Sequence, residues 1–287
     1  MARSSHEQND KLSILYIVAT PIGNYGDVTE RAIQVLREVD LILAEDTRRT
    51  KPLLQRFAVG KPKLMSFHEH NEESMREKII QRLLQGERVA LVSDAGTPLI
   101  SDPGFGLVSA AHDAGIKVVP LPGASAVITA LSAGGLPTDQ FFFAGFLPAK
   151  STQRRKSLQG LYDQVGTLVF YESSHRIIDS LSDCLEVLGD RPAVLARELT
   201  KMYETIRYSS LKELKSFVDA DDNQQKGEFV LLIEGAEKQS NEPDQQEVDR
   251  LLTVMMEDLP LKQSAQLVAK ILGLKKNSVY QRALELK

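Results

Sequence analysis

The sequence predicts an α/β protein with two α/β domains and a small helical unit near its C-terminal end. Three observations lead to this fold class. Apolar runs alternate with amphipathic helical patterns over residues 12–135, strand patterns outnumber helical ones over 136–236, and only helical patterns occur over 246–287. The length of 287 residues agrees with this division, because a domain typically takes roughly 150 residues.

The first domain is expected to contain a mainly parallel sheet covered by helices, because strand and helix patterns alternate in it. The strand candidates are the apolar runs at 14–21, 40–46, 88–94 and 116–122. Helical periodicity follows the first strand, where Asp27 or Thr29 is a candidate N-cap. Further helices are expected at 72–85, at 105–114, and over the small-residue segment ASAVITALSAGG.

The second domain is expected to contain a mixed sheet, and the hinge before it is placed near 134–139. Its strand candidates are QFFFAGFLP, GTLVFYES, PAVLARELT, ETIRYSS and GEFVLLIEG. Helical patterns lie near 151–163, 175–188 and 210–218. Helices are therefore too few to connect all of these strands in parallel.

A polar segment, 235–247, is expected to link the second domain to the helical unit. Within that unit a helix, a glycine-containing turn and a second helix capped by Asn277 form a plausible helix-turn-helix pair. From residue 261 onward six basic residues face Glu285 alone, so this end is locally basic in a chain of net charge -4.

Composition narrows the class of protein. The single cysteine, Cys184, excludes a disulfide framework, fits a reducing compartment, and is expected to be a packing residue. The first 13 residues are polar and no apolar run approaches 20 residues, so we expect no signal peptide, no membrane span and a cytoplasmic location. The overall charge gives no sign of nucleic-acid binding, although a local basic patch remains compatible with it.

The sequence lacks the motifs of several common classes of enzyme. No phosphate-binding loop of an NTPase, no serine-nucleophile elbow and no Cys/His zinc array occurs, and ATPIGN after the first strand has one glycine where a dinucleotide-binding turn has three. The histidine-containing segment FHEHNEE is interpreted as a polar rim or a solvated helix start, and no metal site is predicted.

Three Pro/Gly loops follow strands of the first domain: ATPIGN, SDAGTPLISDPG and PLPGASA. In α/β sheets ligands bind outside the carboxyl ends of the strands, and loops of this composition present backbone groups in a preset geometry. None of the three loops carries lysine or arginine, which favours a ligand without phosphate. S-adenosylmethionine, with its adenine, ribose and amino-acid end, fits that description.

These loops and five further segments resemble the tetrapyrrole-methylase superfamily. The further segments are AEDTRRT, GFLPAK, FYESSHR, ARELTKMYE and GEFVLLIEG, and the resemblance runs from about Leu15 to Gly235. Within the superfamily the pattern is most similar to the bacterial branch that methylates 16S ribosomal RNA on a ribose 2′-hydroxyl. Corrin-methylating relatives carry a Gly-Gly-Asp-Pro type of loop where this chain has SDAGTPLISDPG, which argues against a tetrapyrrole substrate.

The resemblance implies the two-domain class III methyltransferase fold, with S-adenosylmethionine in the cleft between domains, and a homodimer. It also implies a decoding-region cytidine of 16S rRNA as substrate, so that the partner is the 30S ribosomal subunit or its RNA. The residues that match the family's cofactor contacts are Pro21, Asp94, Ala95, Gly96, Thr97, Ile100, Ser125, Ala126, Glu172, Leu199 and Gly227.

A ribose hydroxyl is a poor nucleophile, so a general base is expected. The candidates are Asp102, Glu198 and the carboxylates of AEDTR, Glu45 and Asp46, while Lys201 or Arg197 is a candidate to lower the hydroxyl pKa or to hold phosphate. For RNA contact we select exposed-looking basic residues in loops and helix starts. These are Arg48, Lys150, Arg154, Arg155, His175, Arg176, Lys275 and Lys276.

Two other readings remain open from the sequence. One is a methyltransferase of the same fold that acts on a tetrapyrrole-like small molecule or on a protein. The other is a non-catalytic RNA-binding factor of ribosome assembly. The basic segments favour RNA over a small molecule, and cofactor binding would separate an enzyme from an adaptor.

Overall fold

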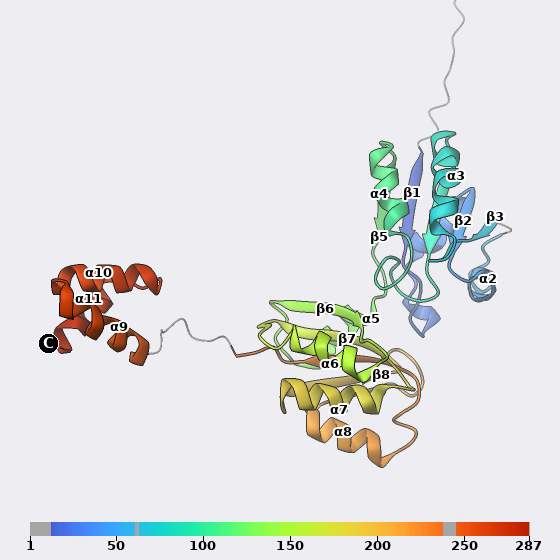
Figure 1. Ribbon diagram of the computed structural model, residues 1–287. Helices are drawn as coiled ribbons and strands as arrows, with labels where there is room; N and C mark the ends of the chain where they lie inside the picture. Colours follow the sequence, from blue (N-terminus) through green and yellow to red (C-terminus); the bar gives the residue numbers. More distant parts are fainter. Residues whose placement is uncertain (1–12, 61–62, 238–244, 287) are drawn as a thin grey trace, which may run out of the picture. The chain divides into compact units, whose positions relative to one another are not determined.

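The computed structural model describes residues 13–60, 63–237 and 245–286. It divides into two compact units, Met1–Ala236 and Glu237–Lys287 (Figure 1). The larger unit contains two five-stranded sheets, and the described part of the smaller unit is helical. The predicted α/β fold class with a small C-terminal helical unit is therefore confirmed.

The first sheet is parallel throughout, with strand order β3-β2-β4-β1-β5. Its strands are β1 (Ile14–Val18), β2 (Leu41–Ala44), β3 (Lys63–Ser66), β4 (Arg88–Val92) and β5 (Lys117–Leu121). Since β4, β1 and β5 are adjacent and parallel, their carboxyl ends lie at one edge of the sheet. The three Pro/Gly loops that follow them therefore start at that same edge.

Helices cover both faces of this sheet. The short helix η1 (Tyr25–Asp27) precedes α1 (Glu30–Glu38), which packs with α2 (Thr47–Arg56) on one face, while α3 (Glu72–Leu84) and α4 (Phe105–Asp113) pack on the other. Successive strand residues alternate between the two cores, so Ile42 packs with the α1 side and Leu43 with the α3 side. Of the two predicted caps, Thr29 caps α1, since its hydroxyl accepts the Ala32 N–H.

Two elements of the first domain, the helix α2 and the strand β3, were not predicted. Helix α2 contains Pro52, which removes a backbone donor and usually signals the end of a helix. It nevertheless holds because Leu53 and Leu54 are buried against the sheet. Strand β3 is four residues long, lies at the sheet edge and is only partly buried, so its apolar pattern is weak.

Helix α5 (Ala126–Gly134) belongs with the second sheet, although it follows the last strand of the first. Ala130 and Leu131 pack with Val194 and Leu232 of that sheet. The packing is close, because a Cβ atom on Gly134 would lie 2.6 Å from Leu232. The expected boundary at residues 135/136 would separate this helix from the sheet that it covers. The chain crosses between the two sheets just before α5.

The second sheet is mixed, as predicted, with strand order β6-β7-β10-β8-β9. Strands β6 (Phe141–Phe146) and β7 (Thr167–Ser173) are parallel, and β8 (Pro192–Arg197), β9 (Thr205–Ser210) and β10 (Glu228–Ile233) extend it in antiparallel pairs. Helices α6 (Ser151–Gln159), α7 (Ile177–Leu188) and α8 (Leu211–Ala220) cover the face opposite α5. Cys184 is fully buried there, and burial raises the pKa of its thiol to about 12.

The smaller unit contains α9 (Gln245–Asp258), α10 (Leu261–Ile271) and α11 (Lys276–Glu285) around their own apolar core. The prediction that Asn277 caps the last helix is wrong. The N-cap is Lys275, whose carbonyl accepts from Ser278, so Asn277 lies inside the first turn. Most of the predicted linker, 238–244, lies outside the described residues. No helix of the described chain is both long enough and apolar enough to cross a membrane.

Candidate functional site

The three Pro/Gly loops of the first domain are bonded to one another. Thr20 and Gly96 form a two-residue bridge, with N···O distances of 2.8 and 2.9 Å between their backbones. The Thr20 hydroxyl donates to the Ser93 carbonyl at 3.2 Å, and the Thr97 hydroxyl donates to the Ala124 carbonyl at 3.0 Å. The loops after β1, β4 and β5 thus form one rigid surface at the sheet edge.

Two glycines allow this close approach. Gly96 has a φ of +80°, and a Cβ on it would lie 3.3 Å from the Ile22 side chain. A Cβ on Gly123 would lie 2.6 Å from that of Ala19, which no side chain could occupy without moving the loop. Glycine at these positions therefore keeps the loop backbones in contact.

The cofactor candidates from these loops lie together, with different exposures. Gly96 and Pro21 are buried, Thr97 is half-buried, and Ala95 and Ile100 are exposed. Ser125 is the N-cap of α5 without a side-chain cap bond, and Ala126 opens that helix. The backbone-lined surface carries no lysine or arginine in its three loops. It therefore fits S-adenosylmethionine, a ligand with a positive sulfonium and no phosphate.

A fourth loop, after β2, joins this surface through Asp94. The Asp46 N–H donates to the Asp94 carboxylate at 3.0 Å, and the Asp94 N–H donates to Glu45 at 3.3 Å. Hydrogen bonds from Arg48 lower the pKa of Asp46 to about 2. Asp46 is thus a poor proton acceptor at neutral pH, and Asp94 acts as a brace between two loops.

Asp102, by contrast, is half-buried and has a raised pKa. Desolvation by burial raises its pKa to about 6, and the negative charges of Glu45 and Asp94 add to the shift, opposed by a hydrogen bond from Ser93. Asp102 in turn contributes to the raised pKa of Tyr171, about 12, after burial as the main cause. A Cβ on Gly145 of β6 would lie 3.2 Å from the hydroxyl of Ser101, so the residue before Asp102 lies against the second sheet.

The ARELTK segment forms the facing wall of the second domain. The Asn24 N–H donates to the Thr200 hydroxyl at 3.1 Å, so the first-strand loop contacts this segment directly. A Cβ on Gly23 would lie 2.5 Å from Lys201, and Leu199 is buried beside it. Positive φ values at Glu198 and Thr200, +50° and +64°, mark a tightly turned backbone at this contact.

Glu198 and Lys201 are held to each other. Lys201 donates to Glu198 and to Glu228, both at 2.8 Å, and the Glu228 N–H also donates to Glu198. These hydrogen bonds outweigh burial and lower the pKa of Glu198, so it is a weak base. Gly227 has a φ of +109°, and a Cβ on it would lie 2.6 Å from Glu198, so glycine allows Glu198 to pack here. The bonds among Glu198, Lys201 and Glu228 hold this wall of the second domain in place.

Glu172 is occupied inside the second domain. Its carboxylate is buried and accepts from the Ser180 hydroxyl at 2.5 Å and the Ser173 N–H at 2.8 Å, and it pairs with Arg176 at 2.9 Å. These bonds join the end of β7 to the start of α7. The Glu172 carboxylate is thus engaged inside the second domain, and the contact of Glu172 with the cofactor stays a prediction.

The basic candidates for RNA contact differ in availability. Arg154 is 2% exposed and its Nε lies 2.6 Å from Asp183, which Arg155 also contacts at 2.7 Å. Arg154 is therefore not accessible to a phosphate, because its guanidinium is buried in an ion pair with Asp183. Arg155 is exposed but is already paired with Asp183 and Glu186. The other accessible candidates are the exposed Arg48, Lys150, His175, Lys275 and Lys276, and the half-buried Arg176.

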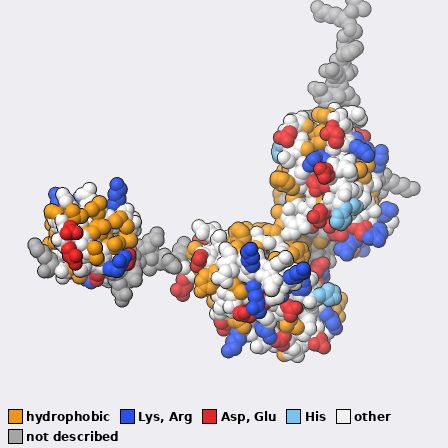
Figure 2. Space-filling model, in the orientation of Figure 1, with side chains coloured by type: hydrophobic (Ala, Val, Ile, Leu, Met, Phe, Trp, Pro, Cys, Tyr) orange, Lys and Arg blue, Asp and Glu red, His pale blue; other side chains and the backbone are white. Residues whose placement is uncertain are grey.

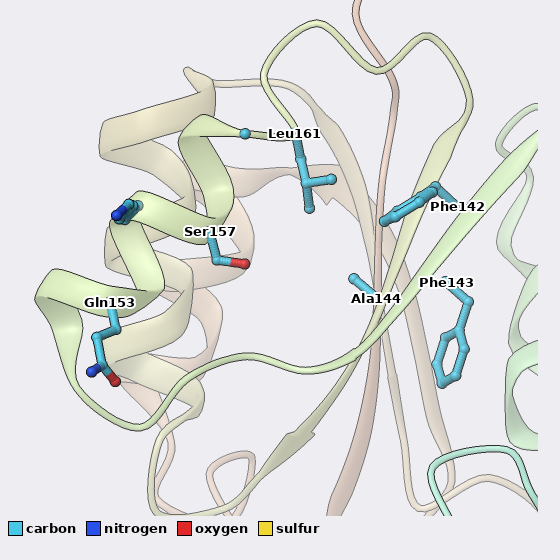
Figure 3. A pocket seen from close by; sticks show the side chains of 8 residues that line it. Phe142, Phe143, Ala144, Gln153, Ser157 and Leu161 are labelled. Carbon is cyan, nitrogen blue, oxygen red and sulfur yellow. The ribbon is translucent and has the colours of Figure 1, made fainter. Parts of the chain in front are cut away.

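A hollow of about 770 Å³ lies elsewhere on the second domain, between β6 and α6 (Figure 3). Phe142 and Leu161 extend toward it, whereas Phe143 points away and packs edge-on against Tyr171, with ring centroids 5.0 Å apart. None of the residues of the Pro/Gly loops lines this hollow. It is thus separate from the candidate cofactor surface.

Sequence reasoning missed several residues that the structure brings to this region. Tyr171 and Thr200 lie in the quoted segments FYESSHR and ARELTKMYE, but neither was selected as a site residue. Lys51 and Arg56 were missed because α2 was not predicted. A count of charges over 47–56, which holds four basic residues and no acidic one, would have found them.

Comparisons with known proteins agree with this architecture. The family model of Tetrapyrrole (Corrin/Porphyrin) Methylases matches residues 14–215, and a model described as the RsmI C-terminal HTH domain matches 242–287. A ribosomal RNA small subunit methyltransferase I from Escherichia coli O157:H7 is 52% identical over 94% of this chain and 94% of its own length. The protein of that name from Vibrio cholerae is 53% identical over 95% of this chain and 94% of its own.

Solved structures show the same fold at low identity. Diphthine synthase aligns with a TM-score of 0.58 and 15% identity, covering 77% of this chain and 90% of that one. Uroporphyrin-III-C-methyltransferase from Thermus thermophilus aligns with a TM-score of 0.54 and 21% identity, covering 77% and 94%. S-adenosylmethionine is the cofactor of this group. By its family match and its half-identical relatives, the chain belongs to the tetrapyrrole methylase family.

Proposed function

We propose that this protein transfers a methyl group from S-adenosylmethionine to the ribose 2′-hydroxyl of a cytidine in the decoding region of 16S rRNA. The single observation that carries the general activity is the half-identity, over nearly the whole chain, to proteins named ribosomal RNA small subunit methyltransferase I. The ribose position and the cytidine come from the motif resemblance. The same resemblance supports a cytoplasmic homodimer acting on the 30S subunit.

The bonded loop surface would hold the cofactor mainly through backbone groups. Gly96, Thr97 and Ala126 lie on that surface, and the Asn24–Thr200 bond ties it to the facing wall. The bound cofactor supplies a sulfonium methyl group that is already electrophilic. The chain's own contribution is then to align the hydroxyl, to exclude water and to accept a proton.

Asp102 fits the role of proton acceptor better than Glu198 and Asp46 do. A base works best when its pKa lies near the working pH, and the pKa of Asp102 is raised to about 6. Ion pairing holds the pKa of Glu198 and of Asp46 below the ordinary range. In the proposed reaction the hydroxyl proton passes to Asp102 as the new oxygen–carbon bond forms and the carbon–sulfur bond breaks.

The test is methyl transfer from labelled S-adenosylmethionine to 30S particles that lack 2′-O-methyl groups, followed by nuclease mapping of the label. Label on the ribose of one decoding-region cytidine is the expected result. Label on a base, or on another RNA, would overturn the position but not the activity. Tight cofactor binding without any labelled rRNA would overturn the RNA substrate.

Assembly is tested separately, by light scattering on the purified chain. A mass of twice the chain's 31.9 kDa is expected. A monomer at micromolar concentration would overturn the homodimer and leave the reaction untouched.

A further inference from the structure

Helix α2 carries four basic residues and no acidic one in a protein of net charge -4. Thr50, Leu53 and Leu54 are buried against the first sheet. The basic side chains occupy the remaining, exposed positions: Arg48, Arg49, Lys51 and Arg56. We call these four residues the α2 basic face. Figure 2 shows blue side chains grouped where Figure 1 draws α2.

The charge of this face is only partly neutralised. Among the described residues Lys51 and Arg56 take part in no ion pair. Arg48 pairs with Asp46 and Arg49 lies 3.4 Å from Asp94, yet their side chains remain 88% and 70% exposed. The three basic residues of α6 differ, since two of them are bound by Asp183 and Glu186. The α2 basic face is therefore the stronger attractor for phosphate.

An aromatic ring lies beside this face. Arg56 stacks over Tyr25 with its Cζ 5.8 Å from the ring centroid, and Phe57 supports the ring edge-on at 6.1 Å. Arg37 fixes Phe57 through its backbone carbonyl, at 2.6 Å. The Tyr25 side chain is nevertheless 46% exposed. A braced, half-exposed ring next to cations is the arrangement on which unstacked bases pack.

Tyr25 and the α2 basic face both border the candidate cofactor site. Tyr25 follows Pro21 by four residues in the loop after β1, and that loop contacts the facing wall through Asn24. Asp46, the N-cap of α2, is bonded to Asp94 of the β4 loop. If the target nucleotide of an RNA strand enters between the loops, the nucleotides that flank it would lie near Tyr25 and the α2 basic face.

We propose that the α2 basic face and Tyr25 bind the single-stranded rRNA that flanks the target nucleotide, the cations holding phosphates and the Tyr25 ring stacking on one base. This proposal rests on the proposed RNA substrate. It assigns the flanking strand to the first domain, where the sequence had singled out Arg48, and adds Arg49, Lys51, Arg56 and Tyr25 to that residue.

The first experiment compares two double variants of equal charge change in the same domain. Lys51→Gln/Arg56→Gln removes the two cations that have no ion pair, and Lys78→Gln/Lys117→Gln removes two exposed lysines outside α2. The readouts are KM for 30S particles and filter binding of 16S rRNA at several salt concentrations. S-adenosylmethionine affinity, by calorimetry, is expected to be unchanged in both variants.

Each phosphate contact with single-stranded RNA contributes roughly 0.7 to the slope of log affinity against log salt. The α2 variant is expected to flatten the slope by about 1.4 and to raise KM for 30S particles about tenfold or more, with kcat little changed. The control variant is expected to keep the wild-type slope and KM. Equal behaviour of the two variants would overturn the proposal.

The second experiment tests the ring. Tyr25→Ala is expected to raise KM by roughly five- to a hundredfold, the range for a lost base–aromatic stack, and Tyr25→Phe is expected to restore it. Loss of activity in both variants would overturn stacking in favour of a hydroxyl role. If the wild-type protein methylates no rRNA, the proposed function itself fails. If the wild type is active and the α2 and Tyr25 variants match it, only the flanking-strand proposal fails.

Discussion

Thr20 and Gly96 exchange two backbone hydrogen bonds, which joins the loop after β1 to the loop after β4. Gly96 takes part with a positive φ of +80° and contributes no side chain to the contact. A loop that presents its backbone in this way owes its shape to one residue type, so substitutions of Gly96 are informative.

Gly96→Ala is expected to weaken S-adenosylmethionine binding at least tenfold and to lower the free energy of unfolding by about 1 to 2 kcal/mol, the cost of an L-residue in the left-handed region. The matched control is Gly115→Ala, where Gly115 has a φ of +68° in the α4–β5 turn and no atom of the described residues lies within 4 Å of an added Cβ. The control should lose similar stability but keep cofactor affinity. Calorimetry and denaturant unfolding measure both quantities, and normal affinity in Gly96→Ala would refute the loop assignment.

Asp102→Asn is expected to reduce kcat by two or more orders of magnitude, within the usual range for a lost general base. In the wild type kcat should fall as pH decreases through about 6, because Asp102 becomes protonated there. A pH–rate profile on 30S particles measures this. The exposed Asp139→Asn serves as the control, and a profile that stays flat down to pH 5 would rule Asp102 out.

The same substitution has an opposite effect on stability. The pKa of Asp102 is higher in the folded protein than its ordinary value of 3.8, so the folded state binds the proton more tightly. The wild type therefore loses stability as pH rises from about 4 to about 6. Asp102→Asn should be more stable than the wild type at pH 8, and the difference should shrink toward pH 4. Urea unfolding at both values measures it, and a constant difference would contradict the raised pKa.

Substitutions in the Arg154–Asp183 ion pair are expected to affect the stability of the protein and not its RNA binding. Both side chains are buried, so Asp183→Ala leaves an uncompensated guanidinium and is expected to cost about 3 to 5 kcal/mol. Arg154→Met keeps the volume and is expected to leave the salt dependence of rRNA binding unchanged. A flatter salt slope in Arg154→Met at intact stability would return this residue to the RNA interface.

The C-terminal unit is expected to add RNA affinity without taking part in cofactor binding. It has its own apolar core, and the larger unit, Met1–Ala236, is compact without it. A chain ending at Ala236 should therefore fold and bind S-adenosylmethionine normally, with a higher KM for 30S particles. The full-length variant Lys275→Gln/Lys276→Gln should show part of that increase. An unchanged KM in both would place RNA binding on the larger unit alone.

The sequence by itself determined the secondary structure of most of the chain, the parallel and mixed sheets, and the loops at the strand ends. Those features follow from local apolar periodicity and from Pro and Gly positions, which a short window reveals. Helix α2 was not predicted because Pro52 interrupts its local pattern, and it forms because Leu53 and Leu54 are buried against the sheet.

Only the tertiary structure decided which charged residues are available. Arg154 and Arg56 look alike in the sequence, but one is enclosed with Asp183 from a helix 29 residues away and the other remains exposed beside Tyr25. Glu172 is likewise committed to α7, while burial, with a smaller contribution from neighbouring carboxylates, raises the pKa of Asp102. Burial and pairing depend on residues that are distant along the chain and adjacent in space, so they emerge only when the chain is folded.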